Sequence, residues 1–197
     1  VVSLKQFYQS PCGSYASQLI RIALRRMWKD VKHEHLVGIG YALPYLVSYL
    51  GEAERIAAIM PAGQGVLHWP SNGPNCTLLS DETLLPLADA SQHRILLTHV
   101  LEHSEDARAL LDECWRVLAP GGRVLAVVPN RRGLWVRAYD GPYAYGRGFS
   151  IAQLRSLFLD QRFTPTQQAY ALYLPPSQHG WWLRAARFIE GLGRQWC

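Results

Sequence analysis

The chain has 197 residues, of which 49% are apolar and 18% are charged, a balance that is ordinary for a globular protein. No apolar run reaches the roughly 20 residues that cross a bilayer, and no secretory signal opens the chain, so we expect a cytoplasmic protein. The four cysteines lack Cys-x-x-Cys spacing, which argues against a zinc or redox site and suits a reducing compartment. We therefore expect no metal site.

The basic surplus leaves two interpretations open. The formal net charge is +5. Such a charge either attracts an anionic partner or is simply a basic surface without one. No long basic run and no alternation of basic and aromatic residues is present, so the sequence favours a small molecule over nucleic acid as the partner.

The N-terminal residues predict an irregular lead-in over 1–11, followed by a helix that starts at Ser14. Next, a short strand over 35–37 leads into the turn Gly38-Ile39-Gly40-Tyr41-Ala42. A glycine-rich turn between a strand and a helix lets the backbone approach a ligand closely. Pro44 suits the first turn of the helix that follows.

Short apolar runs predict further strands over 56–59, 76–79 and 95–98. Residues 95–128 then form a strand–helix–strand pattern. Ser104 is the expected helix cap, and Cys114 lies on the apolar stripe of the helix. Such a unit implies a parallel sheet with a right-handed crossover.

A family resemblance enters at these residues. The runs L-E-H-S-E-D and R-V-L-A-P-G-G-R-V-L look like the strand-four to strand-five region of class I S-adenosylmethionine-dependent methyltransferases, type 11. The resemblance implies a Rossmann-like α/β three-layer sandwich with a mainly parallel sheet of six or seven strands. It also implies one domain over 1–197, with an N-terminal lid or helix over 1–34, a core over 35–175 and a C-terminal helical segment over 176–197.

The resemblance further implies S-adenosylmethionine as cofactor and S-adenosylhomocysteine as product. Gly38 and Gly40 match the family's glycine motif, and Tyr41 follows them. Leu36 stands where the family has an acid that contacts the methionine part. Met60, followed by Pro61, stands where the family has the acid that binds both ribose hydroxyls; its loss predicts weaker cofactor binding.

Two further cofactor positions follow from the same resemblance. Asp81 lies five residues before a proline, where the family has an acid that binds the adenine amine, with the Glu82 amide near the ring. A helix cap or a solvated turn is the equal alternative. Thr98 ends the fourth strand, at the edge where ligands bind in parallel sheets. His99 and His103 are the candidates for a catalytic base. His99 is closer to the expected substrate side, whereas a histidine in the place of His103 is more often a structural hydrogen-bonding residue.

The C-terminal part carries three predictions. Ser150 should cap a helix, and residues 166–172 should form a sixth strand. Residues 181–189 look helical and rich in tryptophan and arginine, and either pack on the sheet or dock on a membrane or protein partner. No strand-like run follows, so we expect the family's seventh strand to be missing, supplied by another chain or cut off.

Methyl transfer from S-adenosylmethionine to an unidentified acceptor is the leading functional prediction. Such a transfer needs a general base only when the acceptor must lose a proton. Leu36, Met60 and the absent seventh strand support the alternative, a catalytically inactive methyltransferase-like binding or scaffold protein. The arginine surplus alone supports the weakest alternative, nucleic-acid binding.

Overall fold

Five parallel strands form the centre of the protein, seen in a computed structural model that describes residues 2–137 and 141–172. Their order across the sheet is β3-β2-β1-β4-β5, so both neighbours of β1 come from later in the chain. The strands are β1 (His35–Gly40), β2 (Arg55–Pro61), β3 (Thr77–Ser80), β4 (Gln92–Thr98) and β5 (Leu118–Val127).

The register brings the carboxyl ends of the strands to one edge. Ile39 of β1 lies beside Ile59 of β2, and Gly40 lies beside Thr98 of β4. Because all strand pairs are parallel, the residues that follow β1, β2 and β4 leave the sheet on the same side. Below, this side is called the carboxyl edge.

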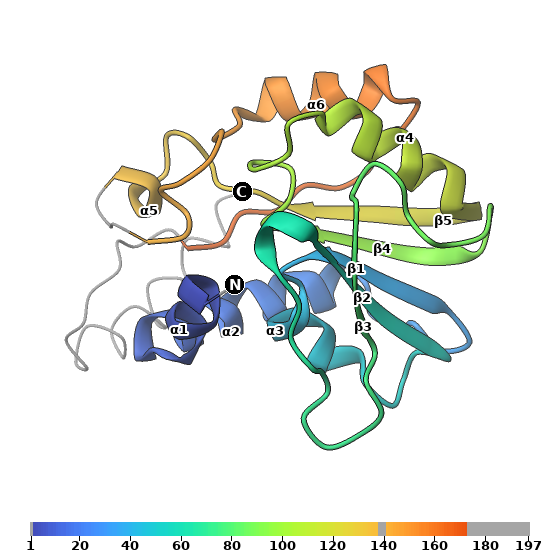
Figure 1. The fold of residues 1–197 in the computed structure, drawn as a ribbon. Helices are drawn as coiled ribbons and strands as arrows, with labels where there is room; N and C mark the ends of the chain where they lie inside the picture. Colours follow the sequence, from blue (N-terminus) through green and yellow to red (C-terminus); the bar gives the residue numbers. More distant parts are fainter. Residues whose placement is uncertain (1, 138–140, 173–197) are drawn as a thin grey trace.

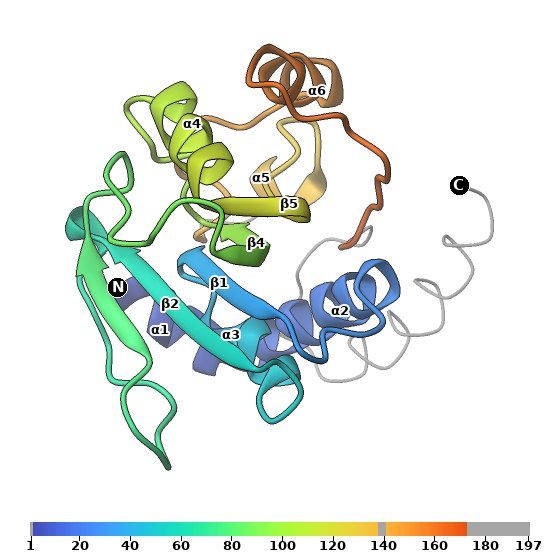
Figure 2. The same cartoon turned by 90° about the vertical axis from the view of Figure 1, so that its right-hand side faces the viewer.

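Helices cover both faces of the sheet, which gives the predicted three layers (Figures 1 and 2). One face carries α4 (Ala107–Val117) and α6 (Ile151–Asp160). The other carries α1 (Val2–Gln9), α2 (Pro11–Met27), α3 (Leu43–Leu46) and the 3-10 turn η1 (Val47–Tyr49). The turn η2 (Ala62–Gln64) follows β2, and α5 (Leu134–Arg137) lies at the carboxyl edge. Each face has its own apolar cluster, as expected for strands buried on both sides.

The N-terminus corrects the first prediction, because residues 2–9 form α1 instead of an irregular lead-in. The next helix begins at Pro11, and Ser10 caps it by accepting a hydrogen bond from the Gly13 amide at 3.1 Å. Serine followed by proline is a strong helix start. Ser14, the predicted start, lies inside the helix, and Ser10-Pro11 was the signal that counted.

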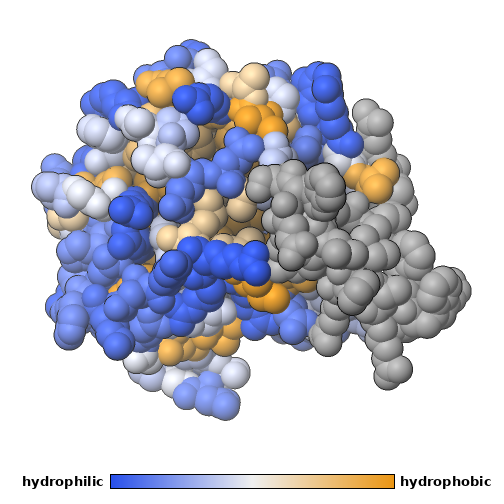
Figure 3. All heavy atoms as spheres, turned by 180° about the vertical axis from the view of Figure 1, so that it is seen from behind, coloured by the Kyte–Doolittle hydropathy of each residue, from blue (hydrophilic) through white to orange (hydrophobic). Residues whose placement is uncertain are grey.

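The predicted six or seven strands are not confirmed: the described residues form a sheet of five strands. Residues 166–172, expected as a sixth strand, are irregular. Ala171 and Leu172 nevertheless pack against the apolar cluster between the sheet and the helices α1, α2 and α3. The expected segment over 181–189 lies outside the described residues. Figure 3 shows the side where β5 forms the sheet edge; apolar surface gathers in the middle of this view, with hydrophilic surface above and below.

Helix caps confirm one prediction and correct another. Ser150 caps α6 in a full capping box with Gln153. By contrast, α4 begins at Ala107, and Asp106 caps it by accepting from the amides of Arg108 and Ala109; Ser104 lies before the helix. In the part of the chain that the structure describes, no helix has the length and apolarity to cross a membrane.

Candidate active site

The two predicted glycines are required by packing at the end of β1. A Cβ on Gly38 would lie 2.5 Å from Ala42 Cβ, so the bare backbone lets α3 fold back on the strand. Gly40 has φ of +87°, and a Cβ there would lie 2.1 Å from the Thr98 carbonyl oxygen. The Tyr41 amide donates to the same oxygen at 2.9 Å. The glycine turn therefore joins the ends of β1 and β4.

The position of the ribose acid is apolar and closed. Met60 is fully buried, and it belongs to the apolar cluster that includes Tyr45 and Leu46 from the α3 region. Leu36, at the position of the other family acid, is 1% exposed in the same cluster. Pro61 is buried as well. Neither substituted position presents a polar group to the carboxyl edge.

Asp81, the candidate for binding adenine, lies in an exposed turn after β3. Its Oδ1 accepts from the Thr83 amide and the Thr83 hydroxyl, both at 2.8 Å, and these hydrogen bonds lower the pKa of Asp81. These contacts are those expected if Asp81 simply stabilises a solvated turn. Adenine binding by Asp81 stays a prediction. Glu82 beside it is partly buried in the same turn, and its role near the adenine ring stays a prediction too.

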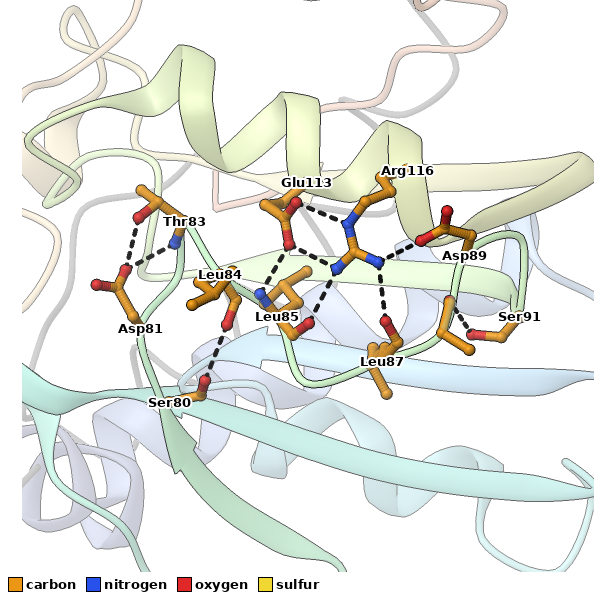
Figure 4. Close-up of polar contacts among 11 residues, drawn as sticks. Ser80, Asp81, Thr83, Leu84, Leu85, Leu87, Asp89, Ser91, Glu113 and Arg116 are labelled. Atoms are coloured by element: carbon orange, nitrogen blue, oxygen red, sulfur yellow. Dashed lines mark hydrogen bonds and ion pairs between the residues drawn. The ribbon is translucent and has the colours of Figure 1, made fainter.

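The loop after this turn is fixed to α4 (Figure 4). Glu113 accepts from the Leu85 amide at 2.8 Å, and the Arg116 guanidinium donates to the carbonyls of Leu85 and Leu87, both at 2.9 Å. Arg116 also bonds Asp89 at 2.6 Å and Glu113 at 2.7 Å. This network explains the loop conformation without a ligand.

His99 is the buried histidine of the carboxyl edge. It follows Thr98 directly at the end of β4, is 3% exposed, and has φ of +51°, a left-handed conformation that non-glycine residues seldom adopt. Its Nδ1 lies 3.2 Å from Glu102 Oε1, and Glu102 is also 3% exposed. The Gln64 amide, from the turn after β2, donates to the His99 carbonyl and so crosses the end of β1.

Three tyrosine hydroxyls converge in front of His99. The Tyr8 hydroxyl of α1 lies 2.6 Å from His99 Nε2, 2.7 Å from the Tyr45 hydroxyl and 3.0 Å from the Tyr143 hydroxyl. Burial first, and then the neighbouring tyrosines, raise the pKa of Tyr8 well above its usual value; burial raises the pKa of Tyr143 to about 12. The hydroxyls are therefore neutral near pH 7.

Several buried polar atoms at this edge lack a hydrogen-bond partner among the described residues. They are Thr98 Oγ1, Gln64 Oε1, His99 Nδ1 and both carboxylate oxygens of Glu102. The His99–Glu102 contact is close but poorly directed, so it is an electrostatic contact and not a formed hydrogen bond. Unpaired buried polar groups are costly, and their concentration here marks the edge as a candidate site.

Of the two histidines that the sequence offered, only His99 lies in this cluster. His103 is exposed, with its ring beside Gly146. Sequence reasoning missed the roles of Glu102, Tyr45 and Tyr143. Glu102 is the glutamate of the run L-E-H and follows His99 by three residues, so the sequence did contain a signal for this pair. In the described ranges, no group of three or more His, Cys, Asp or Glu residues could hold a metal ion.

This three-layer arrangement, with its site beyond the carboxyl ends of parallel strands, is the Rossmann-like fold of class I methyltransferases. Residues 37–126 match the family model described as the methyltransferase domain, type 11. The resemblance read from the sequence to class I S-adenosylmethionine-dependent methyltransferases is confirmed, and S-adenosylmethionine is the cofactor that this family implies.

Individual proteins also resemble this chain in part of its sequence or in its fold. A curated protein of Mycolicibacterium smegmatis, described as a probable S-adenosylmethionine-dependent methyltransferase, is 47% identical over 47 residues, which is 24% of this chain and 18% of the relative. A methyltransferase of Haloferax volcanii, solved with the Trm112 methyltransferase activator, is 19% identical, with TM-score 0.64, covering 83% of this chain and 75% of its own. A Thermotoga maritima S-adenosylmethionine-dependent methyltransferase, described as a possible histamine N-methyltransferase, is 19% identical, with TM-score 0.60. The match covers 80% of this chain and 74% of the Thermotoga chain.

The carboxyl edge fits S-adenosylmethionine in part. The unpaired Gln64 Oε1 and Thr98 Oγ1 near the glycine turn are suited to the charged amino-acid end of the cofactor. Met60 is not suited to the ribose hydroxyls, because a buried thioether cannot replace a carboxylate acceptor. The Tyr8 ring stacks on Tyr41 next to the turn, with centroids 5.6 Å apart.

Proposed function

We propose that this protein transfers a methyl group from S-adenosylmethionine to a small acceptor that must lose a proton, with His99 as the base. The observation that carries the proposal is the buried His99–Glu102 pair at the end of β4, in which His99 Nε2 lies 2.6 Å from the Tyr8 hydroxyl. A base is of use only at an acceptor that gives up a proton, so this pair distinguishes the reaction from a transfer that needs positioning alone.

Glu102 and His99 would handle the proton, and residues near the glycine turn would hold the cofactor. The Glu102 carboxylate next to Nδ1 favours the tautomer that carries its proton there, which leaves Nε2 free to accept. The same carboxylate stabilises the imidazolium after it has accepted a proton. When bound, S-adenosylmethionine supplies an electrophilic methyl group on a sulfonium. Gln64, Thr98 and the Gly38–Gly40 turn would hold its amino-acid end.

The acceptor and partners are proposed on weaker grounds. Histamine, the possible acceptor of the Thermotoga relative, is a small amine, which is consistent with a small-molecule acceptor here. The Haloferax relative was solved with a protein activator, so a protein partner is a reasonable second component. Binding of adenine by Asp81 and Glu82, and a cytoplasmic location, stay predictions.

The test is turnover in the presence of S-adenosylmethionine, followed as S-adenosylhomocysteine formed with a panel of hydroxyl and amine acceptors. His99→Gln should lower the turnover rate by about 10²- to 10⁴-fold, the usual contribution of a general base. Its affinity for S-adenosylhomocysteine should stay within about threefold of the wild type, because the base does not hold the cofactor.

His103→Gln is the matched control, because the exposed histidine lies outside the Tyr8 cluster and its loss should leave the rate unchanged. Equal rates for wild type and His99→Gln would reject His99 as the base.

A second function, that of a binding or scaffold protein without activity, is favoured by two specific observations. The buried Met60 removes the ribose acceptor, and Tyr8 occupies space beside the glycine turn. A folded protein that binds neither S-adenosylmethionine nor S-adenosylhomocysteine at millimolar concentration would decide for this alternative.

A further inference from the structure

Tyr8 makes a complete set of hydrogen bonds at the carboxyl edge. A phenol hydroxyl has one proton to donate and two lone pairs that accept. In the tautomer that carries the His99 proton on Nδ1, beside Glu102, Nε2 accepts from the Tyr8 hydroxyl. The Tyr8 oxygen can then accept from the hydroxyls of Tyr45 and Tyr143, which lie 2.7 and 3.0 Å away. One acceptor and two donors thus surround the Tyr8 oxygen, and this is the set of partners that satisfies a phenol hydroxyl completely.

The ring of Tyr8 is recognised as well as its oxygen. Tyr41 stacks on it with an interplanar angle of 16°, and Phe7 and Tyr45 meet it edge-on with centroids 5.0 and 6.0 Å away. Stacked and edge-on pairs are the favourable arrangements of aromatic rings. The surroundings of the Tyr8 side chain therefore select a flat aromatic ring that bears a hydroxyl.

Tyr8 reaches this place from the surface. The residue is only partly buried, whereas the other aromatic residues around its hydroxyl and His99 itself are buried. It lies in the last turn of α1, the short helix at the carboxyl edge in Figure 1. A displacement of α1 that withdraws Tyr8 would leave a hole that leads from the surface to His99 Nε2.

We propose that the Tyr8 position, bounded by His99, Tyr41, Tyr45 and Tyr143, is the acceptor site of this protein, that the acceptor is a phenol, and that Tyr8 occupies the site when no acceptor is bound. The inference rests on the proposed methyl transfer and names its substrate class. Its evidence is independent of the family match, because it comes from the contacts of one side chain.

The chemistry balances with the groups named. The acceptor's phenolic proton moves to His99 Nε2, and Glu102 stabilises the resulting imidazolium. The phenolic oxygen forms the new bond to the methyl carbon, while the carbon–sulfur bond of the donor breaks and its electron pair stays on sulfur. The products are an aryl methyl ether, S-adenosylhomocysteine and a proton that His99 releases to water.

The experiment measures binding to the full chain without turnover. The probe is 4-methylphenol, and the matched probes are toluene, which lacks the hydroxyl, and 4-methylanisole, which cannot donate a proton. In the wild type, 4-methylphenol should bind and accelerate amide hydrogen exchange in α1, because it must displace Tyr8. Toluene and 4-methylanisole should bind about tenfold more weakly or worse, because they leave the buried Nε2 unpaired.

Two variants keep the proposal testable if one of them folds poorly. Tyr8→Ala and Tyr8→Phe should each bind 4-methylphenol more tightly than the wild type, by about tenfold in the former, because the competing side chain is absent or loses its hydrogen bonds. The proposal is overturned if 4-methylphenol fails to bind the wild type, if α1 stays protected when it binds, or if toluene binds as well as the phenol.

Titration of the same proteins with S-adenosylhomocysteine separates this inference from the proposed function. Binding of S-adenosylhomocysteine without phenol binding would overturn the acceptor assignment and leave methyl transfer standing. Phenol binding without S-adenosylhomocysteine binding would support the site and overturn the transfer reaction.

Discussion

Replacing Tyr8 with phenylalanine removes an oxygen atom that lies within hydrogen-bond distance of three buried side chains. The change leaves the ring contacts with Tyr41 and Phe7 and deletes hydrogen bonds to three buried groups. The hydroxyls of Tyr45 and Tyr143 can still partner one another, whereas His99 Nε2 loses its partner. One buried unpaired group costs about 1–3 kcal/mol, so we expect the free energy of unfolding to fall by about 2 kcal/mol.

Denaturant unfolding measures this loss, and an unchanged slope would show that the folded and unfolded states remain comparable. For a chain of this size the midpoint of thermal unfolding should fall by about 4–8 °C. Tyr49→Phe is the matched control, because its buried hydroxyl has no hydrogen-bond partner among the described residues. That variant should be as stable as the wild type or slightly more so. Equal stability losses in the two variants would refute the reasoning.

Three further changes test the packing and charge assignments. Met60→Asp should lower the free energy of unfolding by about 3 kcal/mol or more, because it buries a carboxylate in an apolar cluster, whereas Met60→Leu should cost less than about 1.5 kcal/mol; equilibrium unfolding compares them. The Arg25 guanidinium lowers the pKa of Glu52 in the folded protein. The wild type should therefore be more stable than Glu52→Gln at pH 7, and this advantage should disappear as the pH falls through the pKa of Glu52 in the folded state. A stability difference that does not change with pH would contradict the ion pair. Arg116→Ala should cost about 1–3 kcal/mol and speed amide exchange in the loop that it holds, whereas Arg108→Ala, which breaks an exposed ion pair, should change stability by less than about 0.5 kcal/mol.

The sheet and its crossover could be read from the sequence because their signals are local and repeated. The apolar runs marked β1, β2, β3 and β4 to within one to three residues, and the strand–helix–strand pattern around Cys114 identified α4 and β5. The glycine turn was located correctly, although Gly38 and Gly40 are explained by contacts with Ala42 and Thr98 that no sequence pattern displays. The division of the chain into lid, core and tail stays a prediction.

The candidate site was found in part, because its members come from distant parts of the chain. His99 was named from its place after β4, but Tyr8 and Tyr143 are 135 positions apart, and only the fold brings their hydroxyls to 3.0 Å. Met60 was singled out because it stands in place of the acid that binds ribose, and weaker cofactor binding at this position stays a prediction. Its complete burial depends on the packing of α3 and was therefore invisible in the sequence.

The central claim is that the carboxyl edge binds S-adenosylmethionine in spite of Leu36 and Met60. Calorimetric titration of the full chain with S-adenosylmethionine and S-adenosylhomocysteine tests it most directly. The account predicts saturable binding at one site, tighter in Tyr8→Phe than in the wild type, because the hydroxyl no longer holds α1 over the edge. A folded wild type and a folded variant that both show no binding at millimolar ligand would contradict it.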